Sequence, residues 1–200
     1  IVHPLEVAEV VWRDFGVDDK NVILAALLHD SIEDQAELLR MKNGDPENID
    51  KRRSGLDYIG KKFGSDVAGL VEELSNPEKS KKDIEKELIS LGYKIEDQNF
   101  EREKNKLKNK YYLEHVKEII EKDPRLMAIK LADFSLNALA LDNVKDDPSR
   151  KAKLLVKYQP VGKLFLDKID NPDETTKRMI EKFDSQKLSW LRDELEHLVG

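Results

Sequence analysis

The apolar residues of this chain recur every three or four positions almost throughout, which is the spacing of one face of a helix. Near the start, the pattern predicts a helix that ends before Gly16, a residue type suited to close a helix. Its expected apolar stripe consists of Leu5, Ala8, Val11, Trp12 and Phe15. The sequence shows no long alternating strand pattern, no internal repeat and no glycine-rich phosphate loop. It therefore predicts an all-α fold.

Two helices are expected to form the centre of the protein. Asp18 or Asp19 could cap the first, and its apolar residues from Val22 to Leu28 occupy most sides of the helix. The second should open at Asp123, because the following proline takes an early helical position where its missing N–H costs little. The apolar residues of this second helix are Leu126, Ile129, Leu131, Ala132, Leu136, Leu139 and Leu141.

Turn signals divide the rest of the chain. The polar stretch from Met41 to Ser54 is expected to be a loop, and Asn76-Pro77 should end a short helix. Further on, Pro160 and Asn171-Pro172 should separate three helical segments, the last of which covers Leu188–Val199.

The pattern predicts a single domain over residues 1–200. Its core is expected in about residues 1–75 and 111–167, with extra C-terminal helices at about 173–199. Between the two parts of the core, residues 76–110 form an insertion dominated by charge. We interpret this insertion as a solvated, partly helical excursion, and an arm that binds a partner is the alternative.

Composition narrows the classes of function. The chain has 200 residues, a net charge of −6 and no cysteine, which excludes disulfides, thiolate zinc sites and a cysteine nucleophile. It lacks the basic stripe of a nucleic-acid-binding protein, and its longest apolar stretch is far shorter than the roughly 18 residues of a membrane span. No signal peptide is recognisable, although we expect the natural N-terminus to lie further upstream. We therefore expect a cytoplasmic protein that binds neither nucleic acid nor membrane.

Four polar residues stand where an apolar core would not place them. His29 and Asp30 directly follow the apolar run of the first central helix. Asp133 interrupts the second, and His3 stands just before the first helix. Taken singly, His3 is typical of a surface histidine, and the pair His29-Asp30 is typical of a helix cap. Asp133 alone could be a hydrogen-bond partner of some other ligand. Together they favour one divalent metal, because a buried carboxylate is costly unless it is paired or bound to metal. Imidazole and carboxylate ligands suit Mn²⁺, Fe²⁺, Zn²⁺ or Mg²⁺, of which Mn²⁺ is expected first.

Four segments of the chain resemble a known family. They read HPLEVAEVV, ILAALLHDSIED, FGSDVAGLVEELS and IKLADFSLNAL, in this order. Over roughly residues 1–141 they resemble the hydrolase domain of RelA/SpoT-type enzymes and small alarmone hydrolases, a branch of the HD superfamily of metal-dependent phosphohydrolases. The combination of ALLHD…ED with KLAD…N is more specific than either piece alone. The resemblance implies an HD-domain helical bundle whose four metal ligands are His3, His29, Asp30 and Asp133.

The resemblance also implies which residues are catalytic. It matches Glu33 and Asp34 to the acidic pair that follows the HD motif in the family. The spacing agrees, because each acid lies four residues beyond a ligand and, if the helix continues, one turn above it on the same face. There the two carboxylates would accept a proton from the attacking water or orient it. A solvated helix end is the alternative for this pair.

Asn137 and Lys130 are expected to contact the substrate. Asn137 lies one turn beyond Asp133 and matches the asparagine of the family motif, whereas Lys130 lies one turn before Asp133. The lysine would share the negative charge that develops on phosphorus. The alternatives are a capping or core amide for Asn137 and a snorkelling surface lysine for Lys130.

The chain departs from the alarmone hydrolases in its second motif. Phe134 stands where the family has an arginine, and Leu139 and Ala140 replace polar residues that help to hold guanine. A phenylalanine cannot pair with phosphate, but it offers a flat apolar face to a base or ribose, so Phe134 is a third expected substrate contact. Either the substrate carries fewer phosphates, or a basic residue among Lys104 to Lys110 replaces the arginine.

These residues predict a metal-dependent phosphohydrolase that acts on a phosphate ester or pyrophosphate of a small-molecule nucleotide. A 3′-pyrophosphohydrolase of guanosine tetraphosphate is the form that the resemblance implies. The alternatives are an HD-type nucleotidase for a simpler nucleotide and a non-catalytic HD module that senses a nucleotide. The sequence leaves open whether the protein forms a homo-oligomer.

Overall fold

The computed structural model describes residues 2–44, 50–76, 81–139, 141 and 147–200, and every regular element within them is helical. The elements are α1 (Val2–Glu9), the π-helical turn η1 (Val10–Asp14), α2 (Lys20–Leu28), α3 (Ser31–Asn43), α4 (Lys51–Phe63), α5 (Ser65–Leu74), α6 (Lys81–Ser90), α7 (Phe100–Lys122), α8 (Pro124–Ala138), α9 (Pro148–Asp170), α10 (Glu174–Ile180) and α11 (Ser185–Val199). The all-α prediction is confirmed. None of the described helices combines the length and the apolar character needed to cross a membrane.

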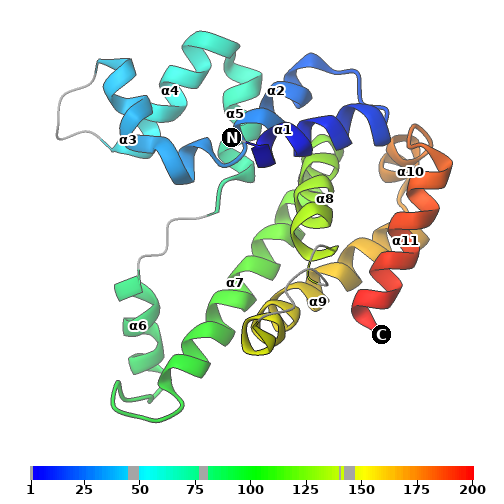
Figure 1. Ribbon diagram of the computed structural model, residues 1–200. Coiled ribbons are helices and arrows are strands. Elements are labelled where there is room, and N and C mark those ends of the chain that lie inside the picture. Colours follow the sequence, from blue (N-terminus) through cyan, green and yellow to red (C-terminus); the bar gives the residue numbers. More distant parts are fainter. Residues whose placement is uncertain (1, 45–49, 77–80, 140, 142–146) are drawn as a thin grey trace.

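Helix α8 forms the centre of the bundle, with eleven of its 15 residues buried. It packs against α1, α2, α5, α7, α9 and α10 (Figure 1). Its start follows from local chemistry, because the carboxylate of Asp123 accepts a hydrogen bond from the N–H of Arg125 while Pro124 occupies the first turn. Asp19 caps α2 in the same way. Both central helices therefore begin where the sequence predicts.

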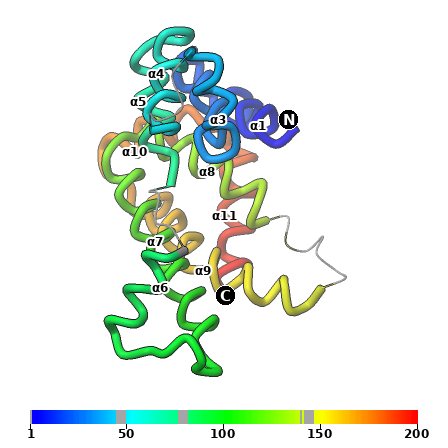
Figure 2. The backbone as a smooth tube through the Cα atoms, turned by 90° about the vertical axis from the view of Figure 1, so that its left-hand side faces the viewer, coloured from blue at the N-terminus to red at the C-terminus, as the bar shows by residue number. Residues whose placement is uncertain are grey.

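The charged insertion has a small apolar core of its own. Helix α6 packs against the first half of α7, and the two extend away from the rest of the bundle (Figure 2). Four buried apolar side chains and two tyrosines hold them together, namely Ile84, Leu88, Phe100, Leu107, Tyr93 and Tyr111. The expectation that the insertion is partly helical therefore holds, and its small apolar core is a feature that the composition does not indicate.

The first helix is clamped at its far end by the C-terminal part of the chain. The ring of Phe15 stacks on that of Phe183 with centroids 4.1 Å apart, and the N–H of Asp184 donates to the carbonyl of Asp14 at 2.9 Å. Gly16 has a φ of +62°, and a Cβ at this position would lie 2.4 Å from the carbonyl oxygen of Lys182. Only glycine allows this approach without a shift of the backbone.

Three local predictions differ from the structure. Ala8, Val11 and Phe15 of the predicted stripe are buried, but Leu5 and Trp12 are more than half exposed and Val7 is buried as well. Trp12 lies in the π-helical turn, whose wider winding changes which residues face the core. Pro160 lies inside α9 and does not end it. Pro160 faces solvent while Tyr158, Val161 and Phe165 of the same helix pack into the core, so the lost hydrogen bond is tolerated.

The predicted loop is shorter than expected, because α3 continues to Asn43 and α4 begins at Lys51. The middle of that loop, residues 45–49, and Pro77 of the expected Asn76-Pro77 break lie outside the described residues.

Candidate metal centre

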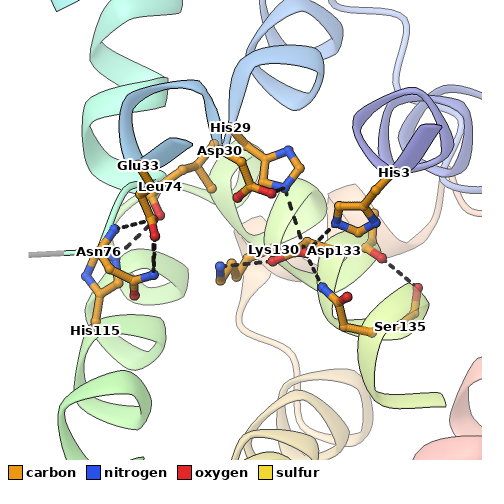
Figure 3. Close-up of polar contacts among 12 residues, drawn as sticks. His3, His29, Asp30, Glu33, Leu74, Asn76, His115, Lys130, Asp133 and Ser135 are labelled. Atoms are coloured by element: carbon orange, nitrogen blue, oxygen red, sulfur yellow. Dashed lines mark hydrogen bonds and ion pairs between the residues drawn. The ribbon is translucent and has the colours of Figure 1, made fainter. Parts of the chain in front are cut away.

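A break between two helices places the HD pair. Helix α2 ends at Leu28 and α3 begins at Ser31, so His29 and Asp30 form the junction. The carbonyl of Asp30 starts the new helix by accepting the N–H groups of Glu33 and Asp34. The side chains of His29 and Asp30 leave this junction toward α8 (Figure 3).

The surroundings of His29 suit a metal ligand. Its side chain is 3% exposed, and its Nδ1 lies 2.8 Å from the carbonyl oxygen of Ala26. A carbonyl oxygen only accepts, so Nδ1 carries the proton in the neutral ring and Nε2 presents its lone pair. Nε2 is buried and makes no hydrogen bond among the described residues. A buried polar atom without a partner is rare, and a metal ion would satisfy it.

The other three predicted ligands surround this nitrogen. Nε2 of His29 lies 3.1 Å from Oδ2 of Asp30 and 3.8 Å from Oδ1 of Asp133. Nε2 of His3, on α1, lies 3.1 Å from the same Oδ1. Ligand atoms bound at about 2.1 Å to one metal lie about 3.0–3.4 Å apart when their bond angle is 90–109°. Ligand atoms of His3, His29 and Asp30 all lie within 4.8 Å of one another, and Asp133 reaches both histidines from α8 (Figure 3). The donor set therefore fits one divalent ion.

Asp133 is held by a network from its own helix. Its Oδ2 accepts from the ammonium group of Lys130 at 3.0 Å, and its Oδ1 accepts from the amide of Asn137 at 2.6 Å. Burial would raise the pKa of Asp133, but Lys130 and the two histidines outweigh this effect and hold the pKa below its ordinary range. The carboxylate is therefore ionised and oriented, as a metal ligand must be.

The neighbouring carboxylates raise the pKa values of both histidines. Burial alone would lower the pKa of His29, yet Asp30 and Asp133 raise it above its ordinary value. The contact with Asp133 likewise raises the pKa of His3. Since a metal binds only neutral imidazole, the ion competes with protons at both rings.

The acidic pair after the HD motif does not stack above the ligands. The helix break turns Glu33 toward Asn76, which donates to it from its backbone N–H at 2.9 Å and from its side-chain amide at 3.0 Å (Figure 3). Asp34 is exposed. Glu33 is therefore fixed at the edge of the site by the end of α5, and the catalytic roles of Glu33 and Asp34 remain predictions.

The structure contradicts Phe134 as a substrate contact. Its side chain is 1% exposed and packs against the rings of Tyr158 and Phe165, with centroids 5.7 and 5.2 Å away. Position 134 faces the interior of the bundle, where a ring contributes to the core rather than to a ligand site. Leu139 also packs partly against the core, and Ala140 lies outside the described residues.

Lys130 is buried beside Asp133. The residue is 6% exposed. Burial would lower its pKa, but the carboxylate of Asp133 raises it overall. The amine therefore balances the charge of a metal ligand and does not face solvent, where a phosphate could meet it. Asn137 is exposed and orients Asp133, so its contact with substrate stays a prediction.

The sequence did not indicate most of the residues that line the region beside the site. Tyr112 and His115 lie three residues apart on one face of α7, a spacing that could have indicated a shared surface. Asn76 and Lys157 reach the same region from the end of α5 and from α9, and no local pattern links them. Only the folded arrangement reveals these two residues.

Histidines and carboxylates that converge from α1, the α2–α3 junction and α8 define an all-helical metal-binding domain. The chain belongs to the HD domain family, whose model matches residues 1–158. HD domains are commonly metal-dependent hydrolases. The match identifies the HD domain and does not single out the RelA/SpoT branch. No curated protein and no solved structure matches the chain.

Proposed function

We propose that this protein is a phosphohydrolase that uses one divalent metal, with Mn²⁺ as the first candidate, to cleave a phosphate ester or pyrophosphate of a nucleotide. One observation carries the proposal. The buried Nε2 of His29 makes no hydrogen bond in the described structure and lies beside Oδ2 of Asp30 and Oδ1 of Asp133. A bundle that needed these residues only for stability would have no reason to leave such an atom without a partner.

The residues of the site divide the work. His3, His29, Asp30 and Asp133 would hold the ion, which supplies a lowered pKa for water and positive charge next to the phosphoryl group. Lys130 and Asn137 fix the carboxylate of Asp133, as residues behind a ligand commonly do. Glu33, held by Asn76, and the exposed Asp34 are the carboxylates available to accept the proton of the attacking water.

The test combines metal analysis with product analysis. The purified protein should contain about one divalent ion per chain, and it should release phosphate or pyrophosphate from at least one member of a nucleotide panel that includes guanosine tetraphosphate. His29→Ala should lose both the ion and the activity. A protein that binds no divalent ion, or a His29→Ala variant that retains full metal content, would refute the proposal.

The same panel separates the possible substrates. The burial of Phe134 removes one expected contact to a base, so the site offers no specific support for guanosine tetraphosphate over a simpler nucleotide. Release of pyrophosphate identifies the alarmone type of reaction, and release of phosphate from a monophosphate identifies a nucleotidase. Metal binding without turnover of any nucleotide would favour a sensing module, although all four expected ligands are present.

A further inference from the structure

A cavity of 430 Å³ lies beside the candidate metal centre, between the end of α5, α6, α7 and α9. Its size is within the range of small-molecule sites. Among its lining residues are Asn76, Lys108, Tyr112, His115 and Lys157. Of these residues, only Lys108 belongs to the lysines, Lys104 to Lys110, that the sequence suggests as replacements for the arginine of the family.

Two contacts join the cavity to the metal centre. Asn76 lines the cavity and donates to Glu33, the acid at the edge of the site. Tyr112 also lines it, and its ring centre lies 5.7 Å from the ammonium group of Lys130, which in turn binds Asp133. A ligand in the cavity is therefore connected to Asp133 through Tyr112 and Lys130, and to the acid Glu33 through Asn76.

The cavity contains a lysine whose ammonium group faces two aromatic rings. The ammonium group of Lys157 lies over the rings of Tyr112 and Tyr158, 4.3 and 4.9 Å from their centres. Within the described part of the chain, no ion pair involves this half-buried lysine. Burial and the charge of Lys130 lower the pKa of Lys157. The carboxylates of Asp133 and Glu33 offset these effects only in part, and a bound anion would offset them further.

The charged insertion supplies a second cation. Lys104 is paired with Glu85, Lys106 with Glu103 and Lys110 with Glu114. In contrast, half-buried Lys108 lines the cavity and forms no ion pair within the described residues. Of the four lysines in residues 104–110, Lys108 is thus the one that remains available to a ligand. Two acids also line the cavity, namely Glu114, which pairs with Lys110, and Glu118.

We infer that this cavity binds the second phosphate or pyrophosphate group of the substrate, beyond the group that is cleaved, through Lys157 and Lys108. The inference deepens the proposed hydrolase function and depends on it for the identity of the ligand as a nucleotide. A neighbouring cavity of 680 Å³ shares Asn109 and Lys157 with the first. A nucleoside attached to the bound anion therefore has space to extend along α9.

Inorganic pyrophosphate is a suitable probe, and its binding can be measured by calorimetry on the full chain. Lys157→Gln should weaken binding by about ten- to a hundredfold, as expected for the loss of one charge-assisted contact. Lys157→Arg keeps the charge and should retain most of the affinity. Lys163→Gln is the matched control, because it removes the same charge from an exposed position on the same helix. If Lys157→Gln does not fold, Lys108→Gln provides the same comparison.

An Asp30→Ala background separates the two anion sites. This variant lacks one of the four candidate metal ligands and should not hold the ion. Pyrophosphate that still binds to the variant must therefore bind in the cavity. We expect residual binding that depends on Lys157. In the metal-loaded enzyme, Lys157→Gln should raise KM for the substrate found in the panel, with a smaller effect on kcat.

The outcomes distinguish this inference from the proposed function. Unchanged pyrophosphate affinity and unchanged KM in both lysine variants would overturn the cavity assignment and leave the hydrolase proposal intact. Lys157-dependent binding of pyrophosphate by a protein that hydrolyses no nucleotide would support the anion site and refute the hydrolase proposal.

Discussion

The pair formed by Asp133 and Lys130 allows structural and metal-binding roles to be measured separately. Both residues are buried, at 7% and 6% exposure. In Asp133→Ala, the ammonium group of Lys130 would lose the only carboxylate that it contacts within the described residues. Leaving one charge of a buried pair uncompensated costs about 3–5 kcal/mol. This cost is a large fraction of the about 5–15 kcal/mol that stabilises a typical domain.

The assay is chemical unfolding of metal-free protein in the presence of a chelator, so that metal affinity does not contribute. We expect Asp133→Ala to lose about 3–5 kcal/mol, and the double variant Asp133→Ala/Lys130→Met to recover most of it because no unpaired charge remains. Asp30→Ala is the control. Its carboxylate is also a predicted ligand, but its side chain is 40% exposed, so its loss should cost less than about 1 kcal/mol.

The pH dependence of this difference follows from the two pKa directions. The pKa of Asp133 is lowered, so its contribution is present above the unfolded pKa of about 4 and is lost as the pH falls through the folded value. The pKa of Lys130 is raised, so its contribution is present below about pH 10 and is lost as the pH rises through the folded value. His3 and His29, whose pKa values Asp133 also raises, lose their protons as the pH rises above about 6.5, so the cost of Asp133→Ala should be largest between about pH 5 and 6 and fall above that range. A metal-free Asp133→Ala protein as stable as the wild type, or no recovery in the double variant, would refute this reasoning.

Three further predictions concern the ion, the acidic pair and the core. A divalent ion at 100 times its dissociation constant should stabilise the wild-type protein by about 2.7 kcal/mol in thermal unfolding, and it should leave His29→Ala unchanged; equal shifts in both would place the ion elsewhere. Glu33→Gln/Asp34→Asn should keep its metal content and lose about 10²–10⁴-fold in turnover, whereas undiminished turnover would exclude the pair as the base. Phe134→Arg should destabilise the fold by more than about 3 kcal/mol, because the position is buried among rings. A stable variant with improved hydrolysis of guanosine tetraphosphate would instead restore position 134 as a substrate contact.

The helical architecture could be predicted because local signals agree with the packing. Helix α8 illustrates this, since Asp123 and the following proline define its start and a nearly continuous apolar sequence accounts for its burial. The prediction for Pro160 is wrong because residues on either side of it pack into the core and outweigh the lost hydrogen bond. Local propensity is a weak guide wherever tertiary contacts are strong.

The candidate ligands could be predicted as residue types but not as a geometry. His29, Asp30 and Asp133 stand out because polar residues interrupt apolar helices. The sequence could not show that the helix breaks at Asp30 or that Glu33 contacts Asn76, because these two residues are 43 positions apart and meet only in the folded chain. Nor could it show that Lys157 lies near the site, since that proximity arises from the packing of α9 on α7.

The stacking of Phe15 on Phe183 fixes one end of the helical segment that carries the candidate ligand His3. His3 and Phe15 stand at opposite ends of the segment formed by α1 and η1, about 18 Å apart at 1.5 Å per residue. If this segment rotated by only about 5° about Phe15, His3 would move by about 1.5 Å. This displacement is far larger than the tolerance of about 0.2 Å for the length of a metal–ligand bond. Phe183 lies beyond residue 158, where the match to the HD domain ends. A chain shortened to the matched residues would keep all four candidate ligands and lose the contact that aims one of them.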